Sequence, residues 1–408
     1  MPVIKFAAGP ANLPTIMANY QGWAELPGDL LTAVLLAAHG SDACFAPAST
    51  FPPAPSLAAV ARFLHAVNTA CKHWRGVSEA ANVPLRVTLG GSPIKAMGGL
   101  PASVRCWLAR RSFAALHFQT SNLNGCSPGE VQQLAPALLN SPEMQHASGS
   151  ILEEIAVRDF VCSRTLCSLL PRFPALRRVL LTGYLVDIDL APLSQLPLLE
   201  VLQLNIEALP KLNCLPATLR HLSVSCIANS ARLSLPEHLE LDSLVVHCPG
   251  QAVYVGLDRV MAKCTRVHIT AERINMLLHV EEDALHSRQS AASMLLRSFQ
   301  RHTKVQHLVL ETWAKDSLVV SLNTPSPVHG QGRRACTLRR FDLLAEAKGA
   351  TSNGGSPCLM AEVLPGTSLS NGKDSNSALL VISKAARTAG QPGASATRLQ
   401  PAAAAAAQ

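Results

Sequence analysis

Aliphatic residues recur through the middle of the chain as an aliphatic, two residues of any kind, an aliphatic, one residue of any kind and a third aliphatic. The pattern occurs at Leu176/Val179/Leu181, Leu199/Leu202/Leu204, Leu219/Leu222/Val224, Leu241/Leu244/Val246 and, in a weaker copy, Cys264/Val267/Ile269. Its first positions are 23, 20, 22 and 23 residues apart, within the range of about 20–29 residues used by leucine-rich repeats. Each copy is expected to be a short strand that turns its aliphatic residues into a core.

More widely spaced copies flank this block, at Phe113/Leu116/Phe118, Leu152/Ile155/Val157, Val305/Leu308/Leu310 and Leu338/Phe341/Leu343. The segments between copies have helical character. Ser127-Pro-Gly-Glu130 is a capping-box signature, and Glu281-Glu-Asp283 precedes an apolar-periodic stretch that ends in Arg297 and Arg301, the charge order that a helix dipole favours. Strand then helix, repeated, predicts a right-handed α/β solenoid, or horseshoe, over residues 83–344. The 41 residues from Cys264 to Val305 allow two short repeats or one repeat with a long helix.

Helical periodicity governs the N-terminal region, after an expected flexible leader at residues 1–22. Leu30, Leu31, Val34 and Leu35 recur at helical spacing. A Pro/Ala/Ser-rich loop follows at residues 46–56, and the helical period resumes after it. Residues 23–80 are therefore expected to form about three short helices, a unit too small to bury much apolar surface without a neighbour. The predicted fold class is α/β, a short N-terminal three-helix module followed by the leucine-rich-repeat solenoid.

Composition supports a narrow aliphatic core, because 48% of the residues are hydrophobic and only 4% are aromatic. From about Ala345 the chain becomes rich in Gly, Ser, Asn and Ala, so residues 345–408 are expected to be a largely disordered tail. Within this tail, Ala378 to Ile382 is apolar enough to cap the solenoid or bind a partner.

The lack of a recognisable targeting or membrane-spanning segment, together with the scattered cysteines, predicts a soluble protein of the cytoplasm or nucleus. Prolines interrupt the first twenty residues, no arginine precedes Arg62, and the longest apolar stretch is far shorter than the roughly 20 residues that span a bilayer. The twelve scattered cysteines are expected to be reduced and buried. Cys162 with Cys167, or Cys264 with His268, has metal-like spacing, but neither has a second matching pair, so no metal or cofactor is expected.

Two segments of the N-terminal region carry a resemblance. Leu26-Pro-Gly-Asp-Leu-Leu31 and Val67-Asn-Thr-Ala-Cys-Lys-His-Trp-Arg75 resemble the first and last elements of the F-box family, in the family's order. This sequence has Ala70 where the family usually has Val, and the loop at 46–56 lengthens the unit. The resemblance implies docking on a Skp-family adaptor within a cullin-based ubiquitin ligase. The docking surface would comprise Leu26, Pro27, Leu30, Leu31, Val34, Leu35, Val67, Cys71 and Trp74.

The residues that alternate with the strand aliphatics form the second candidate site. In leucine-rich repeats such positions point out of the concave face, and here they would bind an unidentified protein substrate through Arg178, Gln203, Asn205, His221, Ser223, His247, Arg266, His268 and His307. This mixed set, with several histidines and two arginines, suits a polar or acidic partner. The formal charge of +8 is spread along the chain without interleaved aromatic residues, so binding of nucleic acid is not expected.

No motif in the chain indicates catalysis. A nucleotide-binding glycine loop, a Gly-x-Ser-x-Gly elbow and a His-Glu-x-x-His pair are all missing from the sequence. The sequence therefore predicts a substrate adaptor whose ubiquitin chemistry belongs to other subunits. The alternative is a leucine-rich-repeat scaffold without a ligase role, in which the F-box-like residues only pack against each other and the first repeat.

Overall fold

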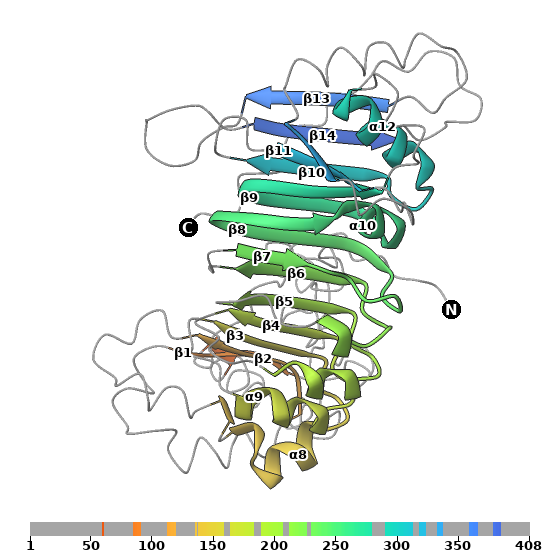
Figure 1. The fold of residues 1–408 in the computed structure, drawn as a ribbon. Coiled ribbons are helices and arrows are strands. Elements are labelled where there is room, and N and C mark those ends of the chain that lie inside the picture. The colour runs from red at the N-terminus through yellow and green to blue at the C-terminus, as the bar shows by residue number, and fades with distance from the viewer. Residues whose placement is uncertain are drawn as a thin grey trace, which may run out of the picture.

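The computed structural model describes residues 59–60, 85–90, 112–119, 135–136, 138–158, 164–182, 189–206, 212–226, 230–279, 290–312, 318–323, 333–337, 359–365 and 378–384. These residues form an α/β structure whose centre is one open, mainly parallel sheet of 14 strands (Figure 1). The α/β class expected from the sequence is confirmed.

From β1 to β10 the main path of the sheet follows chain order, and neighbouring strands of this path are parallel. Its main path contains β1 (Leu85–Gly90), β2 (Phe113–Gln119), β3 (Glu154–Arg158), β4 (Arg178–Thr182), β5 (Val201–Ile206), β6 (His221–Cys226), β8 (Leu241–Gly256), β9 (Cys264–His279) and β10 (His307–Thr312). The short β7 (Ser230–Leu233) and β11 (Leu318–Asn323) pair with the second halves of β8 and β9, and β12 (Arg333–Thr337) pairs antiparallel with β11. Because consecutive strands of this path are parallel, each connection brings the chain back to the end of the sheet at which the previous strand began.

The aliphatic pattern sets the register. Val179 lies opposite Leu202, Leu202 opposite Leu222, and the same alignment continues through β8, β9 and β10. All eight aliphatic triplets that fall within the described residues are buried in a single hydrophobic cluster. A slip of one residue in any strand would turn its aliphatic residues to the opposite face. The eight strands expected from these triplets are therefore confirmed, together with the direction in which their aliphatics point; the ninth copy, Leu338/Phe341/Leu343, lies outside the described residues.

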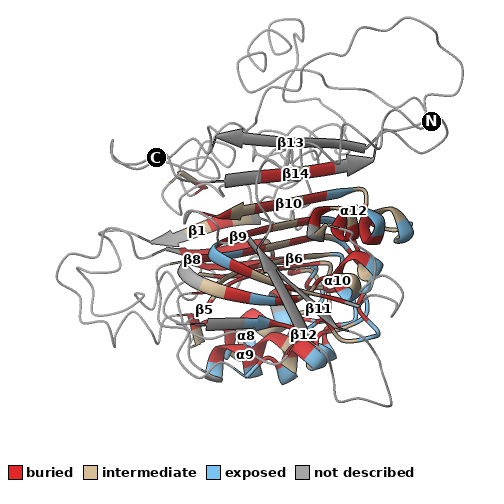
Figure 2. Cartoon of the chain, turned by 45° about the horizontal axis from the view of Figure 1, so that its top comes forward, coloured by how far each residue is buried: buried red, intermediate tan, exposed pale blue. Residues whose placement is uncertain are grey.

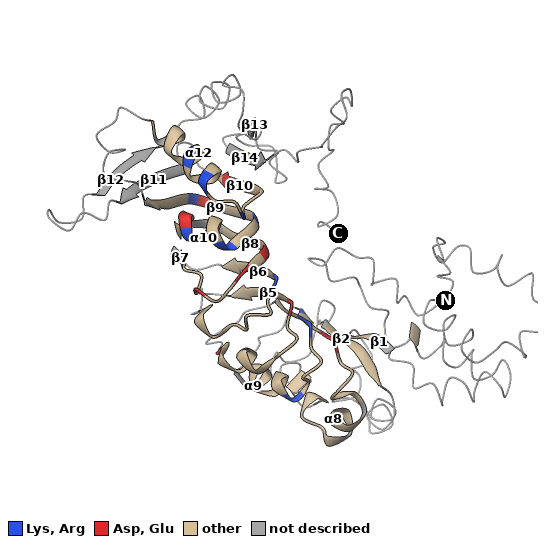
Figure 3. Cartoon of the chain, turned by 90° about the vertical axis from the view of Figure 1, so that its right-hand side faces the viewer, with Lys and Arg blue, Asp and Glu red and all other residues tan. Residues whose placement is uncertain are grey.

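Short helical segments cover the side of the sheet to which these aliphatics point. They are α8 (Pro142–Ser148), α9 (Arg164–Leu169), η4 (Leu170–Arg172), η5 (Ala191–Gln195), η6 (Leu212–Cys214), α10 (Leu257–Lys263) and α12 (Ala291–Arg301). Figure 3 shows the four α-helices following one another along one side of the sheet, and Figure 2 shows buried residues along the strands and exposed residues on the helices. Between β4 and β5 and between β5 and β6, the only helices that the structure describes are the short 3₁₀ helices η5 and η6, in keeping with the usual use of 3₁₀ segments as short connectors.

The last described helix ends in Arg301, as the sequence predicted. α12 begins at Ala291, where the hydroxyl of Ser290 caps the first turn by accepting a hydrogen bond from the backbone N–H of Ser293. The first turn of α12 contains no acidic residue, and Glu281-Glu-Asp283 lies outside the described ranges. Because β10 pairs directly with β9, the long interval after Cys264 holds one repeat, with a 16-residue strand and α12.

The C-terminal edge of the sheet is covered by chain from residues 345–408. β14 (Ala378–Lys384) pairs antiparallel with β10, and β13 (Leu359–Pro365) pairs antiparallel with β14. Leu380 and Ile382 are buried in the same cluster as the strand aliphatics. Within residues 345–408, which were expected to be largely disordered, these two strands are the part that the structure describes, and the expectation that Ala378 to Ile382 could cap the sheet agrees with the pairing of β14 with β10.

Candidate functional site

The polar face of the sheet is formed by the residues that alternate with the buried aliphatics. The ladder aligns them in three rows across β4, β5, β6, β8, β9 and β10. The first row is Arg178, Val201, His221, Ser243, Arg266 and His307; the second is Leu180, Gln203, Ser223, Val245, His268 and Val309; the third is Thr182, Asn205, Ser225, His247, Thr270 and Glu311. We call this surface the strand face.

All nine residues expected to contact a substrate lie on the strand face. Arg266, His247 and His307 are exposed, and the other six are half-buried. Side chains in one row are separated by the strand spacing of about 4.8 Å. The structure thus joins residues from six strands into one continuous surface. All nine residues expected to dock on an adaptor, by contrast, lie outside the described residues.

A row of alternating charge borders the strand face at the starts of the strands. This row consists of Glu153, Arg177, Glu200, Arg220 and Asp242, at the starts of five successive strands. From Arg177 onward, the backbone N–H of each member donates to the carbonyl of the preceding member of the row. Arg177 Nη1 lies 2.9 Å from Glu200 Oε1. Since opposite charges on neighbouring strands stabilise a sheet, this row compensates its own charge and presents no patch of one sign. Figure 3 shows that charged residues are sparse over the rest of the described strands.

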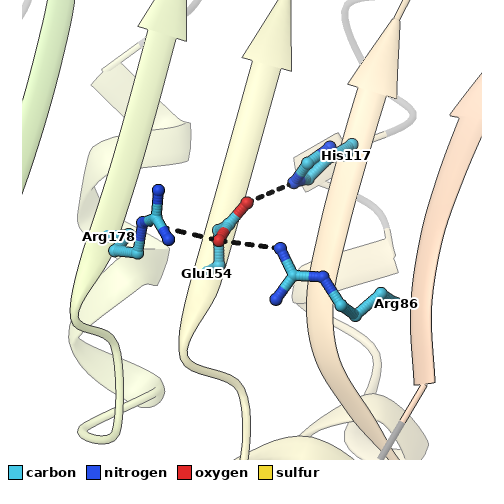
Figure 4. Close-up of polar contacts among 4 residues, drawn as sticks. All are labelled: Arg86, His117, Glu154 and Arg178. Atoms are coloured by element: carbon cyan, nitrogen blue, oxygen red, sulfur yellow. Dashed lines mark hydrogen bonds and ion pairs between the residues drawn. The ribbon is translucent and has the colours of Figure 1, made fainter. Parts of the chain in front are cut away.

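A buried carboxylate dominates the N-terminal end of the strand face. Glu154, on β3, has a side chain that is only 2% exposed, and three cationic or polar groups surround it (Figure 4). Arg86 Nη2 lies 2.9 Å from Oε2, His117 Nε2 lies 2.6 Å from Oε1, and Arg178 Nε lies 3.5 Å from Oε2. The network therefore joins β1, β2, β3 and β4 through one side chain.

The surroundings of Glu154 favour its charged form. Burial by itself raises the pKa of this carboxyl, but the hydrogen bond with His117 and the positive charges of Arg86, His117 and Arg178 outweigh burial, so that the pKa is lowered from 4.5. Sequence reasoning found Arg178 but missed Glu154, Arg86 and His117. The one available signal was a carboxylate in an otherwise apolar strand, where burial requires a charged partner.

Because of this carboxylate, we expect the free energy of unfolding to depend on pH in the acidic range. Its folded pKa lies below the unfolded value, so its contribution is complete well above about pH 4.5 and is lost as the pH falls from there through the folded pKa. Urea unfolding midpoints measured from neutral pH to about pH 3 should therefore decline less steeply in Glu154→Gln than in the wild type. An equally steep decline in both proteins would contradict a special role for this group.

A second polar cluster lies at the C-terminal end of the strand face. Glu311 Oε2 is 3.6 Å from His268 Nε2, and the hydroxyl of Thr270 donates to the same oxygen at 3.3 Å. The pKa of the Glu311 carboxyl is lowered, chiefly by its hydrogen bond with His268. Burial raises this pKa, but by less than the hydrogen bond lowers it. Burial also lowers the pKa of His247 in the same row as Glu311. Both acidic residues of the strand face, Glu154 and Glu311, thus already contact groups of the protein.

The chemistry of the described residues suits binding. Burial raises the pKa of the thiols of Cys167, Cys248 and Cys264 to about 12, which keeps them protonated and poor nucleophiles. Within the described ranges, no group of three or more His, Cys, Asp or Glu residues is placed to hold a metal ion. Of the two pairs with metal-like spacing, Cys264 and His268 are separated, because Cys264 is buried in the core whereas His268 lies on the strand face; Cys162 of the other pair lies outside the described residues.

On the helical side of the sheet, a serine, a histidine and an aspartate form a polar group that connects two helices. Ser298 donates a hydrogen bond to Asp258 Oδ1, and His302 Nε2 lies 3.3 Å from the same oxygen. In a hydrolytic triad the imidazole stands between the serine and the carboxylate. Here the serine contacts the carboxylate directly, so the three residues tie α12 to α10.

No protein family, curated protein or solved structure matches the chain. Among the helices that the structure describes, none has the length and apolar character needed to cross a membrane. The geometry of the strand face is therefore the main guide to function.

Proposed function

We propose that the chain is a non-catalytic substrate-recognition adaptor. In this proposal the parallel sheet is a leucine-rich-repeat solenoid whose strand face binds a protein substrate, and residues 23–80 dock on a Skp-family subunit of a cullin ubiquitin ligase. The observation that carries the proposal is the constant register from β4 to β10, which aligns polar residues of six strands on one surface. Stacked repeats create extended binding surfaces of this kind.

The two F-box-like motifs support the ligase connection. They bracket a small apolar unit, and such a unit is expected to cover its surplus apolar surface with another protein. Cullin ligases need a subunit that binds substrate without performing the chemistry, which agrees with the buried, protonated thiols and the binding character of the strand face.

One observation favours the second candidate, a leucine-rich-repeat scaffold without a ligase role. Val60 lies in the helical stripe expected between the two motifs, and it is 1% exposed and belongs to the same hydrophobic cluster as the strand aliphatics. Val60 is thus buried in the core shared with the strands. In the scaffold alternative, all of the residues assigned to the docking surface would be buried within the chain in the same way.

Leu30→Asp tests the proposal. We expect it to abolish capture of a Skp-family adaptor and a cullin, because it would place a charge in a desolvated contact, while the thermal unfolding of the full chain stays near that of wild type. Leu198→Asp is the matched control, since Leu198 is 42% exposed and lies outside residues 23–80; it should leave capture unchanged. Affinity purification read by mass spectrometry measures both. Loss of binding together with loss of fold in Leu30→Asp would support the scaffold instead.

A further inference from the structure

The first row of the strand face has a regular spacing of cationic and imidazole groups. Arg178, His221 and Arg266 lie in register on β4, β6 and β9, with one intervening strand between each pair. Two strand spacings correspond to about 9.6 Å. Within this row, Arg178, His221 and Arg266 therefore place a hydrogen-bond donor at this interval, with an imidazole between two arginines; Ser243 lies between His221 and Arg266, and His307 follows Arg266.

The charge of the strand face favours an anionic ligand. From β4 to β10 its charged residues are Arg178, Arg266 and Glu311, and the same rows continue onto β1 and β3 with Arg86, Arg158 and Glu154. Both carboxylates are engaged, Glu154 by the arginines and His117, and Glu311 by His268 and Thr270. Arg266 is exposed and forms no ion pair within the part of the chain that the structure describes. An incoming anion thus meets a net positive surface.

The central group is suited to donate a hydrogen bond without carrying a charge. His221 is half-buried, and its Nδ1 is buried without a hydrogen-bond partner among the described residues. Burial is the largest cause of its lowered pKa; Asp242 and Glu200 raise it, and Arg266 and Arg178 lower it further. Arg266, which has no ion pair among the described residues, is therefore the main electrostatic anchor. Arg178, which also contacts Glu154, is the second, and the imidazole is a polar contact between them.

The spacing matches one extended peptide conformation. A polyproline II helix has three residues per turn and rises about 3.1 Å per residue, so every third side chain points the same way at intervals of about 9.3 Å. In a β-strand, side chains alternate between faces, so every third residue would point alternately toward the strand face and away from it. Of these two extended forms, polyproline II is the one that presents acidic side chains at the interval of Arg178, His221 and Arg266.

We propose, on the basis of the adaptor function above, that the strand face binds an acidic, polyproline II-like segment of the partner protein. The segment crosses the strands with acidic residues at every third position, which contact Arg178, His221 and Arg266 in turn. The two outer carboxylates pair with the arginines, and the central one accepts a hydrogen bond from the imidazole. The inference goes beyond the proposed function because it specifies the charge, conformation and spacing of the ligand.

Fluorescence anisotropy with labelled peptides tests the spacing. The probe contains four Glu-Pro-Pro repeats, and the matched probe has the same composition with its glutamates at every second position. At about 0.15 M salt, full-length protein should bind the first probe at least about tenfold more tightly. Equal affinity for the two probes, or no binding of either, would overturn the inference.

Two charge-reversal variants test the contact. Arg266→Glu should weaken binding of the Glu-Pro-Pro probe by about tenfold or more, whereas Arg259→Glu, an exposed site on α10 of the helical side, should leave it within about twofold. An unchanged affinity in Arg266→Glu would contradict the assignment. A labelled oligouridine that binds more tightly than the peptide and depends on Arg266 would show a nucleic-acid ligand and overturn it too. Adaptor capture through Leu30 is measured separately, so the proposed function can fail or stand independently of this result.

Discussion

Replacing Glu154 with glutamine is expected to lower the free energy of unfolding by about 3–5 kcal/mol. The substitution retains the size of the side chain but removes the negative charge shared by Arg86, His117 and Arg178. Removing one partner of a buried ion pair leaves uncompensated charge in a poorly solvated site, and its cost exceeds the net value of the pair. Since Glu154 links four strands, the loss should be concentrated in β1 to β4.

Urea denaturation measures the change in stability, and hydrogen exchange locates it. Glu200→Gln is the matched control, because the Arg177–Glu200 pair has a similar distance of 2.9 Å but side chains that are 46% and 47% exposed. An exposed pair of this kind contributes about 0–1 kcal/mol. Similar losses in the two variants would show that burial of Glu154 does not determine its contribution.

Leu202→Ala is expected to cost about 2–5 kcal/mol. Leu202 is fully buried on β5, between Val179 on β4 and Leu222 on β6. Truncation leaves a cavity within the aliphatic stack, and neighbouring strands cannot close it without losing the register that the other inward residues hold. Because stacked units are stabilised mainly by their neighbours, the amides of β4, β5 and β6 should exchange faster with solvent than those of β9 and β10.

Leu198→Ala provides the comparison for this cavity. Leu198 is 42% exposed and lies four residues from Leu202, so its truncation should change stability by about 0.5 kcal/mol or less. Both variants are measured by urea unfolding and hydrogen exchange. Exchange that rises uniformly over the whole sheet in Leu202→Ala would contradict local coupling between neighbouring strands.

The strand face could be foreseen residue by residue, but its electrostatics could not. Alternation along each strand predicted that Arg178, His221 and Arg266 point away from the core, since Val179, Leu222 and Val267 point into it. The Glu154 network was not foreseen, because its partners His117 and Arg86 are 37 and 68 residues away along the chain. Nothing in the local pattern of β3 identifies those partners.

By itself, the sequence determined which residues of each repeat are buried, because the period of the aliphatic residues indicates which side of each strand is removed from water on folding. It also determined the approximate repeat length, and with it the parallel, sequential order of the strands. Only the tertiary structure decided that β8 and β9 continue for 16 residues, that β14 caps β10, and that four strands meet at Glu154. The burial of a residue follows from the local sequence of its strand, whereas contacts between strands depend on the register in which the connecting loops place them.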